Sequence, residues 1–155
     1  MPDNVVEKQE ARSILQRITG LLRKEPPVPR LAIAMNETRG KPLATRMEVA
    51  DNSYTRRKGL LGRDGLEPGT GLWIYPCESV HTFAMRFAID LVYLDRDCVV
   101  KKLRSSVPPG RLSACFSARS VIELPAGTIG ATGTQIGDRI AIQRLEQRGV
   151  HEQRT

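Results

Sequence analysis

Residues that bind transition metals are scarce in this chain, which has two histidines and three cysteines among 155 residues. A zinc site needs several ligands that converge within roughly 2–2.3 Å of the ion. His81 and His151 lie far apart in the sequence, and no two of Cys77, Cys98 and Cys115 are close neighbours. The sequence therefore predicts no metal site. An odd number of widely spaced cysteines also fits reduced thiols in the cytoplasm better than a disulfide framework.

Aromatic residues are few as well, at 5% of the chain, which leaves few platforms on which unstacked nucleic-acid bases could bind. The net charge of +7 and the pI of about 9.8 would attract polyanions. However, the basic residues are spread along the chain, and no helix-turn-helix or zinc-finger spacing is visible. The glycine-rich segment 127–133 lacks the lysine of a P-loop. We therefore expect neither a nucleic-acid partner nor a cofactor.

Long apolar runs are absent too, and no segment is long enough to span a bilayer. The first 25 residues contain Asp3, Glu7, Glu10 and Glu25 and lack the continuous apolar core of a signal peptide. We therefore expect a cytoplasmic protein without a transmembrane segment.

The N-terminal 29 residues predict an arm. Apolar residues recur at helical spacing over 4–24, and Asn4 can cap this amphipathic helix together with Glu7. Three prolines within 25–29 must end it and form a stiff linker. The helix could pack on the domain, pair with a second copy, bind a protein partner or lie on a membrane surface.

Residues 30–146 predict a single β-rich domain, followed by a flexible tail over 147–155. Both faces of segment 89–94 are apolar after Asp90, so this segment should be a central strand. A short helix is expected over 54–61, with Asn52 or Ser53 as its cap and Gly62 as its terminator. The expected strands cover residues 30–35, 43–50, 72–75, 79–84, 89–94, 98–103, 121–124 and 139–145, with loops over 105–117 and 125–138.

Five segments in this order resemble a known family: RRKGLLGR at 56–63, GLWI at 71–74, VHTFAMRFAIDLVYLD at 80–95, IELPAGT at 122–128 and IGDRI at 136–140. Together they are similar to the prokaryotic family called Domain of Unknown Function 192, over roughly residues 30–145. The resemblance implies an α+β, mostly β domain with a small barrel-like sheet, a short helix at the first segment and no established activity. Two departures are Leu61, where family members often have methionine, and the absence of the N-terminal signal that many members show.

The segment 77–95 places a histidine, an arginine and an aspartate inside sequence that is otherwise typical of a buried strand. If 80–89 is one unbroken strand, His81 shares a face with Phe83 and Met85. The imidazole would then line a shallow apolar pocket, or it would be a core histidine bonded to a backbone carbonyl. The residues predicted to contact a ligand are Arg56, Arg63, Trp73, His81, Phe83, Met85 and Arg86.

Arg56 and Arg63 are seven positions apart and hence nearly in phase on the expected helix. Their guanidinium groups could bind a carboxylate or a phosphate. Alternatively, they could tie the helix to the sheet by pairing with Glu123 or Asp138.

Three residues are candidates for catalysis. His81 could act as a general base, with Asp90 to orient it or with Cys77 as a nucleophile. Nine extended residues span about 30 Å, so His81 and Asp90 meet only if the chain reverses between them. Asp90 is better explained as a turn cap or as the partner of an arginine such as Arg86. Nothing in the sequence indicates a lowered thiol pKa for Cys77.

The sequence thus favours a non-enzymatic binding module for an anionic small molecule or an acidic peptide end. One alternative is a hydrolase or transferase that uses His81 as general base. Another is a scaffold that recruits a protein partner through the helix over 4–24.

Overall fold

The computed structural model describes residues 28–146. The predicted helix over 4–24 and the predicted tail from 147 lie outside the described residues, as does most of the linker over 25–29. Within the described part, nine strands and two short helices follow one another along the chain.

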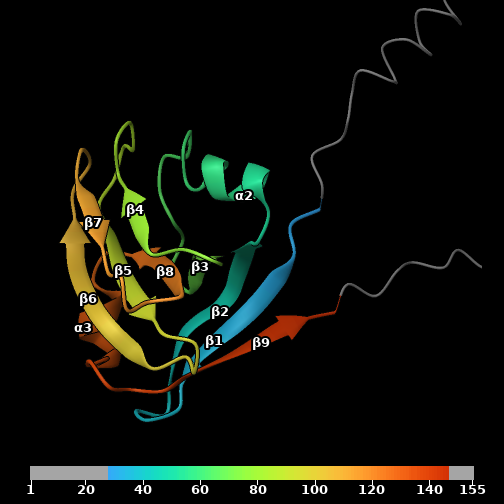
Figure 1. The fold of residues 1–155 in the computed structure, drawn as a ribbon, viewed down its shortest axis with the longest axis vertical. Helices are drawn as coiled ribbons and strands as arrows, with labels where there is room; N and C mark the ends of the chain where they lie inside the picture. The colour runs from blue at the N-terminus through green and yellow to red at the C-terminus, as the bar shows by residue number, and fades with distance from the viewer. Residues whose placement is uncertain (1–27, 147–155) are drawn as a thin grey trace, which may run out of the picture.

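Seven strands form one mixed sheet in the order β6-β5-β8-β3-β2-β1-β9 (Figure 1). Neighbouring strands are antiparallel, except that β2 and β3 are parallel. The bounds are β1 Leu31–Asn36, β2 Lys41–Ala50, β3 Thr70–Ile74, β5 Ile89–Leu94, β6 Val100–Val107, β8 Ser120–Pro125 and β9 Ile140–Leu145. A second sheet pairs β4 (Ser79–His81) with β7 (Leu112–Ala114). The predicted α+β, mostly β fold is confirmed.

The curved seven-stranded sheet does not close into a barrel. Its edge strands β6 and β9 meet at a single bridge, between Val99 and Arg139. Around this bridge, the Ile140 amide donates to the Cys98 carbonyl at 2.9 Å and the Val100 amide to the Asp138 carbonyl at 2.9 Å. The sheet is therefore barrel-like at one end and open elsewhere.

The middle of the sheet is apolar on both faces, as the sequence of residues 89–94 predicted. Strand β5 lies between β6 and β8, and all six of its residues are buried. Each face of the central strands therefore supports its own hydrophobic core. The first core contains Met47, Trp73, Val92, Leu94, Ile122, Leu124 and Ile140, and the second contains Leu60, Leu72, Ile74, Val80, Met85, Ile89, Leu91, Tyr93 and Val121.

Helix α2 (Ser53–Lys58) lies at the same end of the molecule as the β4–β7 sheet (Figure 1). Asn52 begins it with a capping box, in which its side chain accepts the Thr55 amide at 3.0 Å. The helix ends earlier than predicted because Gly59 has φ +47°, a conformation that favours glycine. Arg63 therefore lies beyond the helix, and the predicted helical phase of Arg56 with Arg63 is wrong.

Strand β4 also ends earlier than predicted. The strand expected over 79–84 stops at His81, so 80–89 is not an unbroken strand. The buried Thr82 hydroxyl donates to the Pro108 carbonyl at 2.7 Å and accepts the Arg111 amide at 2.9 Å. Ala84 then has φ +61°, which reverses the chain. His81, Phe83 and Met85 therefore do not share one face of a continuous strand.

The C-terminal half differs from prediction in two places. Strand β6 extends to Val107 and β7 forms at Leu112–Ala114, so part of the loop expected over 105–117 is strand. Helix α3 (Thr128–Thr132) lies within the loop expected over 125–138. None of the helices described is long and apolar enough to cross a membrane.

Candidate functional site

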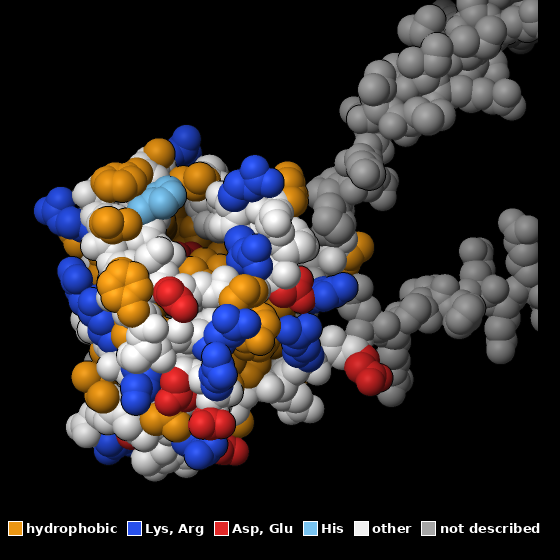
Figure 2. Space-filling view, in the orientation of Figure 1, with side chains coloured by type: hydrophobic (Ala, Val, Ile, Leu, Met, Phe, Trp, Pro, Cys, Tyr) orange, Lys and Arg blue, Asp and Glu red, His pale blue; other side chains and the backbone are white. Residues whose placement is uncertain are grey.

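A pocket of about 600 Å³ opens between α2 and the β3–β4 connection. Figure 2 shows a hollow on this face, with the pale-blue histidine at one edge and Lys or Arg side chains at the other. The pocket is lined by Ser53, Arg56, Arg57, Lys58, Gly59, Leu60, Leu61, Ile74, Pro76, Cys77, Glu78, Ser79, Val80, His81, Met85 and Glu123.

Glu123 lies on β8 in the interior of this pocket, with only 4% of the residue exposed. It follows Val121 on the face of β8 that the second core covers, because alternate residues of a strand point to the same side. Its Oε2 atom is buried and has no hydrogen-bond partner in the described part of the protein. Burial raises the pKa of the carboxyl to about 7, against a smaller lowering by the positive charge of Arg63.

Arg56 provides a positive charge in the same pocket. It is half-buried on α2, and its guanidinium has no hydrogen-bond or ion-pair partner among residues 28–146. By contrast, the Arg57 guanidinium is bonded to the Ser53 carbonyl at 3.1 Å. Arg57 and Lys58 add further positive charge to the rim, whereas Glu78 adds a negative one. The pocket therefore holds an arginine and a buried glutamate that do not pair with each other.

Apolar side chains line the space around these two charged groups. Leu60, Ile74, Val80 and Met85 belong to the second core, and each also lines the pocket. Burial of Leu60 and Met85 is nearly complete, at 3% and 8% exposed. A ligand in this pocket would therefore meet hydrocarbon as well as charge.

His81 lies at the pocket edge but is exposed, so the expectation that its ring would be turned inward is wrong. Its ring stacks on Phe83, with the ring centroids 5.4 Å apart. Phe83 is 52% exposed and does not line the pocket. The two rings form a surface feature beside the opening.

Cys77 and Asp90 do not form a catalytic arrangement with His81. Burial raises the pKa of the Cys77 thiol, which donates to the Ser79 carbonyl at 3.1 Å. A raised pKa disfavours the nucleophilic thiolate. The fully buried Asp90 accepts the amides of Ser106 and Ile129, both at 2.8 Å. These bonds attach β6 and the start of α3 to β5, and they replace the expected bond to Arg86.

The remaining predicted ligand contacts are scattered. The Arg63 guanidinium bonds both carboxylate oxygens of Glu48, at 2.8 and 3.1 Å, and not Glu123 or Asp138 as expected. Arg86 pairs on the surface with Asp64. Trp73 points into the first core, on the opposite face of the sheet, with the Arg144 guanidinium 5.3 Å from its ring. Of the seven predicted residues, only Arg56, His81 and Met85 line the pocket.

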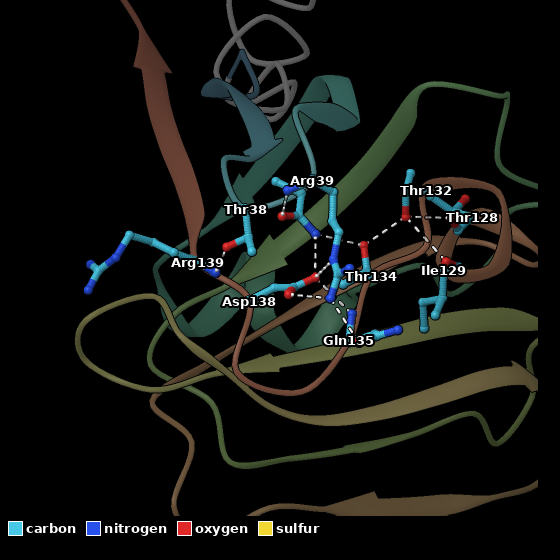
Figure 3. Close-up of polar contacts among 10 residues, drawn as sticks. Thr38, Arg39, Thr128, Ile129, Thr132, Thr134, Gln135, Asp138 and Arg139 are labelled. Carbon is cyan, nitrogen blue, oxygen red and sulfur yellow. Dashed lines mark hydrogen bonds and ion pairs between the residues drawn. The ribbon is translucent and has the colours of Figure 1, made fainter.

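Asp138 is a second buried carboxylate, 3% exposed, and it lies beside Arg39 and Gln135 (Figure 3). It accepts hydrogen bonds from the Arg39 guanidinium at 2.9 and 3.0 Å, the Asn36 amide group at 3.0 Å and the Gln135 backbone at 2.9 Å. These bonds, led by that of Arg39, hold the pKa of the carboxyl well below its usual range. Asp138 therefore attaches the β1–β2 turn to the segment before β9. The part of the chain described contains no cluster of His, Cys, Asp or Glu that could hold a metal ion.

Glu123 is the functional candidate that the sequence interpretation missed, because it was considered only as a partner for an arginine. A signal was present: a lone glutamate stands within the otherwise apolar VIEL at 121–124. A charged residue at a buried strand position requires a partner or a function.

Comparison with known proteins places residues 34–142 within the model of the DUF192 family, described as an uncharacterised conserved group. A UPF0127 protein of Thermococcus sibiricus is 31% identical over 124 residues, which are 75% of this chain and 78% of that protein. A UPF0127 protein of Pyrococcus furiosus is 32% identical over 117 residues, or 72% of this chain and 98% of that protein.

Two solved structures share the fold at 19% sequence identity. One, from Sinorhizobium meliloti, is described as a proposed transcription regulator; it has a TM-score of 0.64 and covers 74% of this chain and 93% of its own. The other is a protein of unknown function from Novosphingobium aromaticivorans, with a TM-score of 0.62, covering 72% of this chain and 83% of its own.

Proposed function

The chain belongs to the DUF192 family, and we propose that within this uncharacterised group it is a non-enzymatic binding module for an anionic small molecule or an acidic peptide end. The ligand occupies the pocket between α2 and the β3–β4 connection, which we call the α2 pocket. The observation that carries this proposal is the half-buried Arg56, which lines a partly apolar cavity and has no side-chain partner among residues 28–146.

The charge of the α2 pocket supports an anion. Arg56, Arg57 and Lys58 come from one turn of α2 and outnumber the rim carboxylate of Glu78. Guanidinium groups bind carboxylates and phosphates with two parallel hydrogen bonds, and such bonds strengthen where water is partly excluded. An anion at Arg56 would supply the partner that residues 28–146 do not.

The chemistry of the neighbouring groups supports binding over catalysis. The candidate nucleophile Cys77 has a raised pKa, and the candidate orienting group Asp90 is already bonded to two backbone amides. His81 stacks on Phe83 at the surface. A general base needs a positioned partner and a substrate within hydrogen-bond reach, and these three residues do not provide such a set.

The proposal is tested on the full-length protein with acetate, succinate, inorganic phosphate and a short peptide that ends in Asp-Glu. Backbone amide shifts of 53–60 and 77–81 are followed by NMR, because Trp73 faces the other core and its fluorescence would not report on this pocket. We expect at least one of these anions to shift these amides, and Arg56→Gln to weaken that binding about tenfold.

The matched control is Arg46→Gln, since Arg46 is an exposed arginine on β2 that does not line the α2 pocket. It should leave the affinity unchanged. The proposal fails if none of the four anions shifts the pocket amides, or if both substitutions weaken binding equally.

A further inference from the structure

Glu123 lacks a hydrogen-bond partner among the described residues, and this observation supports an inference about the ligand. The inference rests on the proposed function. Glu123 is 4% exposed, lines the α2 pocket and has a buried Oε2 without a partner in the described chain. A buried carboxyl without hydrogen bonds costs free energy in either protonation state. A group that donates a hydrogen bond from within the pocket would remove this cost.

The nearest candidate partners within the protein are engaged or directed elsewhere. Arg63 lowers the pKa of Glu123 by its charge, but its guanidinium is bonded to both oxygens of Glu48. The Cys77 thiol donates to the Ser79 carbonyl. Arg56 lines the same pocket but forms no ion pair with Glu123. We therefore expect a bound ligand to supply the donor that Glu123 lacks among the described residues.

Apolar side chains share the pocket with these two groups. Leu60, Ile74, Val80 and Met85 line the pocket together with Arg56 and Glu123. A molecule that reached both groups would place hydrocarbon against these four side chains, and burial of each methylene contributes roughly 0.8 kcal/mol.

We propose that the ligand of the α2 pocket is bifunctional: an anionic group binds Arg56, an aliphatic stem packs on the apolar walls, and a hydroxyl or ammonium group at the other end donates to Glu123. This assigns Glu123 a ligand-binding role. It also distinguishes the ligand from a simple dicarboxylate, whose second carboxylate would be repelled by Glu123 above pH 7.

The inference is tested with three six-carbon probes that differ only in the substituent on the last carbon: hexanoate, 6-hydroxyhexanoate and 6-aminohexanoate. Affinities for the full-length protein are measured at pH 8 from the amide shifts of 53–60 and 77–81. The wild-type protein should bind at least one of the two donor-bearing probes about tenfold more tightly than hexanoate, because hydrogen bonds to a charged group are stronger than neutral ones. A greater gain for 6-aminohexanoate would identify an ammonium donor, and a greater gain for 6-hydroxyhexanoate a hydroxyl donor.

The substitution Glu123→Met retains the length of the side chain and removes both oxygens, so it should abolish the preference for the donor-bearing probes. It should not weaken the binding of hexanoate, which has no group that donates to Glu123. The control Glu67→Met changes an exposed glutamate outside the pocket and should preserve the preference. The wild-type comparison does not require any variant to fold.

The outcomes separate the two proposals. If hexanoate shifts the pocket amides but neither donor-bearing probe binds more tightly, the bifunctional ligand is excluded and the anion site remains. A preference that persists unchanged in Glu123→Met would also overturn the inference. If no probe and none of the four anions binds, the proposed function itself is wrong.

Discussion

Asp138 and Glu123 are buried to a similar degree, at 3% and 4% exposed, but the protein surrounds them differently. Asp138 accepts hydrogen bonds from Asn36, Arg39 and the Gln135 backbone, and its pKa is held well below its usual range. Glu123 accepts none within the described residues, and burial raises its pKa to about 7. Hydrogen bonds therefore stabilise the charged form of Asp138, whereas burial disfavours the charged form of Glu123.

The surroundings of the two residues explain the contrast. Asp138 lies where the β1–β2 turn meets the segment before β9, and its bonds join residues about a hundred positions apart. Glu123 lies on the central strand β8 and lines a pocket. A satisfied buried carboxylate stabilises a fold, whereas an unsatisfied one beside a cavity is a candidate for ligand binding. Hydrogen bonding, and not burial, distinguishes these two carboxyls.

The largest effect is expected at Asp138. Asp138→Asn should destabilise the protein by about 3 kcal/mol, because it leaves Arg39 without its anionic partner and breaks a buried network. Urea unfolding at pH 7 measures this change. Asp97→Asn, at an exposed aspartate, should change the free energy of unfolding by less than about 0.5 kcal/mol. Equal effects at both positions would contradict the structural role of Asp138.

Glu123 should make the free energy of unfolding fall as the pH rises. Its pKa rises from 4.5 to about 7 on folding, so the native state holds this proton more tightly than the unfolded state. Stability contributed by this group is therefore present below pH 4.5 and is lost as the pH rises through 7, by up to roughly 3 kcal/mol.

The variant Glu123→Gln lacks this proton and isolates the effect. The wild-type free energy of unfolding, relative to that of the variant, should fall between pH 4.5 and pH 8 in urea titrations. The exposed control Glu67→Gln should give a difference from wild type that does not change with pH. A flat difference for Glu123→Gln would show that the carboxyl is already satisfied in the native state.

The close contact between β3 and β8 tests how precisely Glu123 is positioned. A Cβ at Gly71 would lie 2.9 Å from the Glu123 carbonyl oxygen and 3.0 Å from Leu124 Cδ2. Gly71→Ala should therefore destabilise the protein by about 1–3 kcal/mol, as thermal or urea unfolding would show.

Gly130→Ala is the matched control, because nothing lies within 4 Å of its added Cβ and the residue is in helix α3. It should be neutral or stabilise by up to about 1 kcal/mol. If Gly71→Ala were equally tolerated, β8 would be free to move and Glu123 would not be held at the pocket.

The smallest effect is expected at Arg63. Its charge lowers the pKa of Glu123, so Arg63→Met should raise that pKa further while leaving the low pKa of Asp138 unchanged. The stability change should stay below about 1 kcal/mol, since the Arg63–Glu48 pair is about one-third exposed. Carboxyl titration by NMR measures both pKa values. An unchanged pKa of Glu123 would mean that the charge of Arg63 does not affect this carboxyl.

The sequence predicted the sheet better than the site. The apolar run over 89–94 correctly predicted a central strand, because burial on both faces leaves a local pattern. The reversal after His81 left no such pattern, since it depends on Thr82 bonding to Pro108 and Arg111, about 26 to 29 positions away. Glu123 and Arg56 line one pocket because α2, β3 and β8 pack together. The spacing of residues along the sequence does not predict this packing.

The ionisation of Glu123 in the free protein determines whether its carboxyl is available to a ligand. Side-chain carboxyl resonances of Glu123 and Asp138 can be followed in one pH titration by carbon-detected NMR. We predict a midpoint near 7 for Glu123 and one well below the usual range for Asp138. A Glu123 midpoint at or below the ordinary value of 4.5 would show that the protein already satisfies this carboxyl, and would contradict its availability to a ligand.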